Sequence, residues 1–216
     1  MRKAILVAMV LALVISGAQA AQIQTKAGSK ELLFGFEGLS NLKLDNFASG
    51  IGGRYYFSDG MAIRPSVQFN VNGTTIKSAT SGITDDKTTD LGIGLNLAAE
   101  KHMTSTGPVS PYLGAGLGFS VLSHKHTLPV STSPASGTTL DTKSTTTSVS
   151  FFLLGGFQWG FTEGLTLGGE YQAGFGVGSA KLKTEIQDQP TVTNSDVSTL
   201  NLGVNTVGMV YLSVAL

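Results

Sequence analysis

The 216-residue chain contains no cysteine. Disulfides therefore cannot hold the fold together, and thiolate sites for zinc or for an iron–sulfur cluster are excluded. Charged residues make up only 13% of the chain, and the formal net charge is zero. A chain without excess basic charge has no strong electrostatic attraction for nucleic acid, and no nucleic-acid partner is expected.

Long hydrophobic runs are missing beyond the first 20 residues. The one apolar run, residues 4–15, follows Arg2 and Lys3 and precedes the sequence Ala-Gln-Ala at 18–20. This arrangement predicts a secretory signal peptide over residues 1–20 that is cleaved after Ala20. A membrane anchor is the alternative, but a spanning helix needs about 20 apolar residues and this run is shorter. Residues 21–29 would then form a short periplasmic segment and residues 30–216 the main domain.

Helical periodicity is also absent, and strict alternation of apolar and polar residues takes its place, which is typical of strands with two different faces. Residues 61–72 show the alternation most clearly. Its apolar face carries Met61, Ile63, Pro65, Val67, Phe69 and Val71. Proline cannot donate a hydrogen bond to a neighbouring strand, so a local bulge is predicted at Pro65.

Seven further segments follow the same rule: 31–39, 47–57, 90–100, 111–122, 148–161, 165–178 and 202–216. Segments of this length can cross a bilayer as tilted strands, and an even number lets the sheet close without a free edge. Arg54 and Arg64 would cost about 2–4 kcal/mol each in hydrocarbon, so the apolar face must meet lipid. The prediction is an all-β protein, an eight-stranded antiparallel up-and-down transmembrane β-barrel.

The connectors between these segments alternate between longer and shorter: 40–46, 58–60, 73–88, 102–108, 124–145, 162–164 and 184–197. Outer-membrane barrels have tight periplasmic turns and longer extracellular loops, so both chain ends are predicted in the periplasm. A soluble lipocalin-like barrel has no reason for this alternation and turns its apolar face inward. An aromatic girdle is expected beside the short turns, formed by Tyr55, Phe57, Trp159 and Phe161.

Two stretches, residues 50–65 and 165–171, resemble the family of small outer-membrane β-barrel domain proteins that includes the OmpA transmembrane domain and OmpX. The resemblance extends over most of residues 30–216 and implies a barrel in the cell outer membrane. It implies outer-membrane lipids, lipopolysaccharide and the barrel-assembly machinery as partners of a monomeric protein. The chain differs from such barrels at its last residue, Leu216, where an aromatic residue is usual.

Five charged residues are predicted to face the lumen: Glu37, Arg54, Arg64, Glu100 and Glu170. An eight-stranded barrel is narrow enough for side chains to fill, so these groups should pair and close the lumen as a structural network. A conducting pore is the alternative.

Candidates for chemistry are few. His124 and His126 share a face if their strand extends that far, but zinc needs three or four ligands, so solvated loop residues are expected and no metal site is predicted. His102 and the abundant serines form no catalytic pattern, so no catalytic residue and no cofactor are predicted. The favoured function is a non-enzymatic structural or surface-interaction role. Alternatives are a lipid-modifying enzyme of the lipid A acyltransferase or deacylase type, or a narrow channel or carrier for a small apolar ligand.

Overall fold

The computed structural model describes residues 23–37, 46–78, 85–103, 107–129, 139–186, 192–197 and 205–216. The predicted signal peptide lies outside these residues. No helix in the described ranges has the length and hydropathy needed to cross a membrane. The strands are β1 (Lys30–Glu37), β2 (Asn46–Ser58), β3 (Met61–Ile76), β4 (Asp86–His102), β5 (Val109–Pro129), β6 (Thr139–Thr162), β7 (Leu165–Ile186), β8 (Val192–Val197) and β9 (Asn205–Ala215).

Antiparallel pairing joins each of β1 to β7 with the next, and β9 closes the ring by pairing with both β7 and β1. β9 pairs with residues 165–174 of β7, whereas β8 pairs with residues 180–185 of the same strand. β8 and β9 therefore share the eighth place in the ring. The predicted eight-stranded antiparallel barrel is confirmed.

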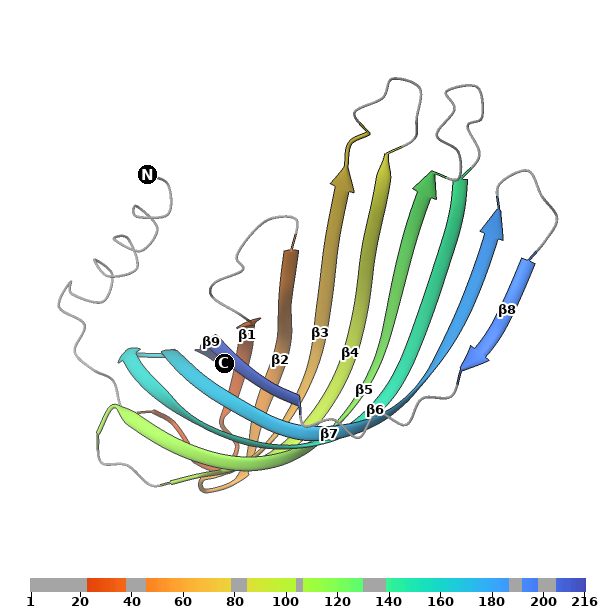
Figure 1. Ribbon diagram of the computed structural model, residues 1–216. Helices are drawn as coiled ribbons and strands as arrows, with labels where there is room; N and C mark the ends of the chain where they lie inside the picture. Colours follow the sequence, from red (N-terminus) through yellow and green to blue (C-terminus); the bar gives the residue numbers. More distant parts are fainter. Residues whose placement is uncertain are drawn as a thin grey trace.

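The wall of the barrel has unequal height. β5, β6 and β7 contain 21, 24 and 22 residues, whereas β1 and β9 contain 8 and 11. Figure 1 shows β3 to β8 rising well beyond β1 and β9. We call this taller part, with residues 73–76, 86–90, 123–129, 139–147, 179–186 and β8, the extension. The opposite end, with the turns at 59–60 and 163–164, is the short-turn end.

The extension corrects the connector lengths predicted from sequence. Much of the expected loops at 73–88, 124–145 and 184–197 is paired strand. The error has a physical cause: alternation of apolar with polar residues disappears there, because water reaches both faces. Threonine and backbone pairing still favour an extended chain in the absence of an apolar face.

The two faces of each strand differ as the alternation predicts. On β4, Leu91, Ile93, Leu95 and Leu97 are outward and between 50% and 59% exposed, whereas the inward Glu100 is 2% exposed. The exposed apolar side chains form a continuous outer band, which is the surface that a transmembrane barrel presents to lipid.

Pro65 does not produce the predicted bulge. The pairing of β3 with β2 is interrupted opposite Gly53 and Arg54 and resumes in the same register on either side. Because Pro65 has no N–H donor, two backbone pairs between β2 and β3 are missing at this point, but the register of the two strands does not change. Register shifts occur instead beside the short turns, at Tyr56/Ser58 and Gly160/Thr162.

Inward glycines leave room for large side chains in the narrow lumen. A Cβ on Gly168 would overlap the ring of Tyr211, and one on Gly156 would lie 2.7 Å from the hydroxyl of Tyr112. The two tyrosine rings thus fit in the lumen because the paired residue on the adjacent strand is in each case a glycine.

Candidate functional site

Arg54 lies at the centre of a charged group that fills the lumen near the short-turn end. Its Nη1 donates to Glu31 Oε2 at 2.7 Å, and its Nε donates to Glu100 Oε2 at 2.6 Å. Its guanidinium lies over the rings of Tyr112 and Tyr211, at 5.3 and 5.5 Å from their centroids. Charge pairing and cation–π contacts together hold this cation away from water, because Arg54 is 1% exposed.

Arg64 connects opposite walls of the barrel. Its two terminal nitrogens donate to Glu170 at 2.6 and 2.8 Å, and its Nε lies 3.1 Å from Glu100 Oε1. β3 and β7 are four places apart in a ring of eight, so the pair of Arg64 and Glu170 spans the full diameter. We call Glu31, Arg54, Arg64, Glu100 and Glu170 the lumen network.

Neutral side chains donate further hydrogen bonds to two carboxylates of the lumen network, Glu170 and Glu31. Tyr112 and Gln172 donate to Glu170 at 2.7 and 2.6 Å, and Gln158 donates to Glu31 at 2.9 Å. Three carboxylates thus face two guanidinium groups, with neutral donors making up part of the difference. Burial of a carboxylate without hydrogen-bond donors costs free energy, so these neutral donors stabilise the buried carboxylates.

A second polar layer lies on the short-turn side of the network. Tyr56 from β2 reaches across to Gln158 on β6, with 3.4 Å between the hydroxyl and Oε1. Thr166 and Ser213 are also buried and hydrogen-bonded to each other. The lumen is therefore crossed twice, once by an ion pair and once by uncharged hydrogen bonds.

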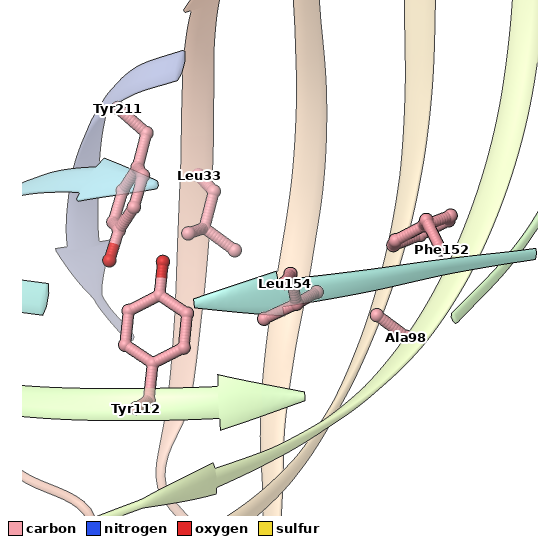
Figure 2. Close-up of a cluster of buried hydrophobic side chains, with 6 residues drawn as sticks. All are labelled: Leu33, Ala98, Tyr112, Phe152, Leu154 and Tyr211. Atoms are coloured by element: carbon pink, nitrogen blue, oxygen red, sulfur yellow. The ribbon is translucent and has the colours of Figure 1, made fainter. Parts of the chain in front are cut away.

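Apolar and aromatic side chains pack around the network. Figure 2 shows side chains converging from different strands: Leu33, Ala98, Tyr112, Phe152, Leu154 and Tyr211. A small cavity lies beside them, lined by polar groups such as Ser66, Asn96 and Gln172. It offers about 30 Å³ to water-sized molecules, enough for about two or three waters.

Four of the five predicted lumen residues meet in this network, namely Arg54, Arg64, Glu100 and Glu170. The side chain of Glu37 lies outside the described residues. Glu31 was missed as a network member. It falls on the inward face that the alternation assigns to Glu37, so following the strand back to its first residues would have found it.

His102 was also missed as a lumen residue, because β4 was predicted to end two residues earlier. Its Nε2 lies 3.2 Å from Glu100 Oε2, its Nδ1 lies 3.5 Å from Ser110 Oγ, and its ring stacks on Tyr112. Serine, histidine and glutamate thus stand in a row, but Ser110 donates to the Met103 carbonyl at 3.3 Å. At 3% exposure Ser110 also offers no approach for a substrate.

His124 and His126 lie on β5 in the extension and not in a loop, which corrects the sequence prediction. His124 pairs with Asp90, and His126 Nε2 lies 2.8 Å from Asp86 Oδ1. No group of three potential metal ligands occurs among the described residues. The two histidines are therefore cross-strand partners of carboxylates on β4.

The predicted aromatic girdle lies beside the short turns. Tyr55 and Phe57 face outward and are 42% and 48% exposed. Trp159 and Phe161 are half-buried against each other, with ring centroids 6.1 Å apart. All four stand at one end of the outer apolar band.

Comparison with known proteins decides the family. Residues 5–207 match the model of the outer membrane protein β-barrel domain family. The chain belongs to this family. Its location in the cell outer membrane, predicted from the connector lengths and the family resemblance, is thereby confirmed. No curated protein matches the chain.

The chain is similar to several solved structures, one of which agrees with its fold at a TM-score above 0.5. A major outer membrane protein of Thermus thermophilus is 11% identical, with a TM-score of 0.58, and the match covers 88% of this chain and 100% of that one. The N-terminal barrel of Pseudomonas aeruginosa OprF is 13% identical with a TM-score of 0.47, covering 88% and 98%. Neisserial surface protein A is 18% identical with a TM-score of 0.44, covering 86% and 94%.

Proposed function

We propose that this outer-membrane barrel is closed to ions and has a structural or surface-interaction role without enzymatic activity. The observation that carries the proposal is the ion pair of Arg64 and Glu170, which spans the lumen with side chains 8% and 0% exposed. An ion on its way through would have to separate this pair and the Tyr56–Gln158 contact behind it. Separation of a buried pair costs about 3–5 kcal/mol, so spontaneous opening is rare.

The proposal includes an orientation. The first residue of β1 and the last residue of β9 lie at the short-turn end, where Glu31 pairs with Ala215. Placing this end in the periplasm puts the aromatic girdle at the inner interface and the extension outside the cell. The extension is then the part that other molecules at the cell surface would meet.

Single cysteines test this orientation without interference, since the chain has none of its own. Thr75→Cys at the tip of β3 should react with a membrane-impermeant maleimide on intact cells. Glu163→Cys in a short turn should react only after the outer membrane is permeabilised. The reverse pattern would overturn the orientation.

Planar-bilayer recordings test the closed lumen. The unmodified protein should show no stable conductance, whereas Arg64→Ala/Glu170→Ala should show brief openings, because it removes the spanning pair and leaves only the uncharged Tyr56–Gln158 contact. Stable conductance from the unmodified protein would contradict the proposal. Lipid A mass spectra from cells with and without the protein should be identical, and a changed acylation pattern would favour the enzyme alternative.

The outer surface offers a second candidate function, a carrier for a small apolar ligand. A groove of about 410 Å³ lies on the outer wall between Phe36, Phe157, Tyr171 and Val210, with several glycines at its base. Met209 lines both this groove and the lumen cavity. Protein-dependent transfer of a labelled alkane into vesicles, abolished by Met209→Trp, would favour this candidate over the closed barrel.

A further inference from the structure

Lysines gather on the outer face of the extension. Five of the ten lysines beyond residue 22 lie there, and all are exposed: Lys87 on β4, Lys125 on β5, Lys143 on β6, and Lys181 and Lys183 on β7. All five lie on the outward face of their strands, the same face that carries the lipid-facing residues nearer the short-turn end. We call them the lysine patch.

The strand register places three of these lysines side by side. Lys125 is paired with Lys143, and Lys143 is paired with Lys183 on the next strand. Neighbouring strands are about 4.8 Å apart, so the three Cα atoms span only about 10 Å. Like charges directly opposite each other destabilise a sheet, so this row is stable only with anionic partners nearby.

Acidic neighbours neutralise only part of the patch. Lys125 Nζ lies 2.8 Å from Asp141 Oδ2, and Lys183 pairs with Glu185 on its own strand. Among the described side chains, Lys87, Lys143 and Lys181 form no ion pair. The acids Asp86 and Asp90 at similar height are on the inner face, where they pair with the histidines. On β8, Asp196 is the register partner of Lys181. The five lysines of the patch thus have three acids as neighbours, Asp141, Glu185 and Asp196, so the outer face keeps a smaller excess of positive charge.

The backbone of the patch lies just above the headgroups of the outer leaflet. On β4, β5, β6 and β7, the outward apolar residues nearest the extension are Leu91, Val121, Val149 and Val177. The nearest lysine of the patch lies four to six positions from each of them, in the direction of the extension. At about 3.3 Å per residue and a tilt of about 40°, this is about 10–15 Å above the hydrocarbon. Lysine side chains can bend back toward the headgroup layer, which is about 5–8 Å thick.

We propose that the lysine patch binds the phosphate groups of the outer-leaflet glycolipid, lipopolysaccharide. The inference rests on the orientation proposed above, because only the outer leaflet contains this lipid beside the extension. The phosphates supply a partner for Lys143, the middle lysine of the row, which forms no ion pair among the described side chains, and add to the acidic partners of Lys125 and Lys183. The apolar band directly below accommodates the acyl chains of the same molecule.

The test uses the full-length folded protein in detergent and measures its affinity for purified lipopolysaccharide by isothermal titration calorimetry. Lys125→Gln/Lys143→Gln/Lys183→Gln should weaken binding on the order of 100-fold, from roughly fivefold for each lysine at an anionic surface. The matched control, Lys26→Gln/Lys30→Gln/Lys101→Gln, makes the same charge change at the short-turn end and should leave affinity within about threefold, since charges more than a Debye length away are screened.

Three further measurements separate the possible outcomes. Chemically dephosphorylated lipopolysaccharide should lose as much affinity as the patch variant does, and added salt should weaken binding of the unmodified protein. Equal losses in both lysine variants, or full binding of the dephosphorylated lipid, would overturn the proposal. Competition by micromolar inorganic phosphate would also overturn it, in favour of a free-phosphate site. Circular dichroism checks that each variant is folded, and the cysteine labelling tests orientation separately.

Discussion

Replacing Arg54 with methionine should strongly destabilise the barrel, because Arg54 is the buried cation that joins two carboxylates. The substitution keeps an unbranched side chain of moderate length, so it removes the charge with limited loss of packing. Glu31 then loses its ion pair and keeps Gln158 as a donor, while Glu100 keeps Arg64. Three buried carboxylates would face a single guanidinium group.

The magnitude follows from the burial of both partners. The side chains of Arg54, Glu31 and Glu100 are 0%, 4% and 0% exposed. Breaking a buried pair from one side costs about 3–5 kcal/mol, since the charge that remains is unpaired. The folding equilibrium should therefore fall by a factor of roughly 100 to 5,000.

Trp159 provides the assay, because it is the single tryptophan of the chain and lies in the girdle. Its fluorescence reports transfer from water into the interface during reversible urea unfolding in detergent micelles. The midpoint should fall at an unchanged slope, which separates lost stability from a changed unfolded state. Adding Glu31→Gln to Arg54→Met should recover part of the loss, although Glu31→Gln alone should destabilise.

A loss below about 1 kcal/mol for Arg54→Met would refute the reasoning, because values of that size are typical of exposed ion pairs. Such a result would mean that water fills the lumen around the network. Additive effects of Arg54→Met and Glu31→Gln would likewise show that the two groups do not interact.

Three other substitutions probe separate parts of the wall. Gly168→Val should cost about 1–3 kcal/mol in the same urea assay, because its side chain would meet the ring of Tyr211; an unchanged midpoint would mean that the ring can move aside. Pro65→Val should change stability by less than about 0.5 kcal/mol, since the ladder already skips this site, and a large gain would show that proline strains β3. His124→Ala should cost less than about 1 kcal/mol, as expected for a part-exposed pair with Asp90; unfolding of the barrel would contradict the separation of the extension from the lumen.

The alternation of residues predicted the closed part of the fold well, because lipid on one side and a packed lumen on the other impose opposite demands on successive residues. Arg54 and Arg64 were assigned inward on the cost of a charge in hydrocarbon, and both are buried. The same reasoning could not predict strands in the extension, because water reaches both faces there and successive polar residues such as Thr142 and Lys143 are both tolerated. Strand pairing there depends on backbone hydrogen bonds that leave no hydropathy pattern.

The partners within the lumen were harder to predict than the residues themselves. Alternation specifies the face of a side chain but not its height, and contacts across a closed ring depend on height. Arg64 and Glu170 are 106 positions apart, so their contact follows from the register of all the intervening strands. His102 was missed because the predicted strand 90–100 ended two residues too early. Glu31 lay inside the predicted strand 31–39, on its inward face, but its contact with Arg54 depends on the relative height of β1 and β2.

Because the barrel wall is taller on one side, the two ends of a single long strand differ in their resistance to local unfolding. In the closed part, the backbone of β3 pairs on both sides along much of its length, and opening it requires breaking the ring. Beyond Asn72 the described pairing of β3 is with β4 alone, as in an isolated hairpin. Amide protons of residues 73–76 should exchange in local openings while those lower on the same strand wait for global unfolding. One continuous strand thus joins a rigid anchor to a surface that can rearrange without releasing the barrel.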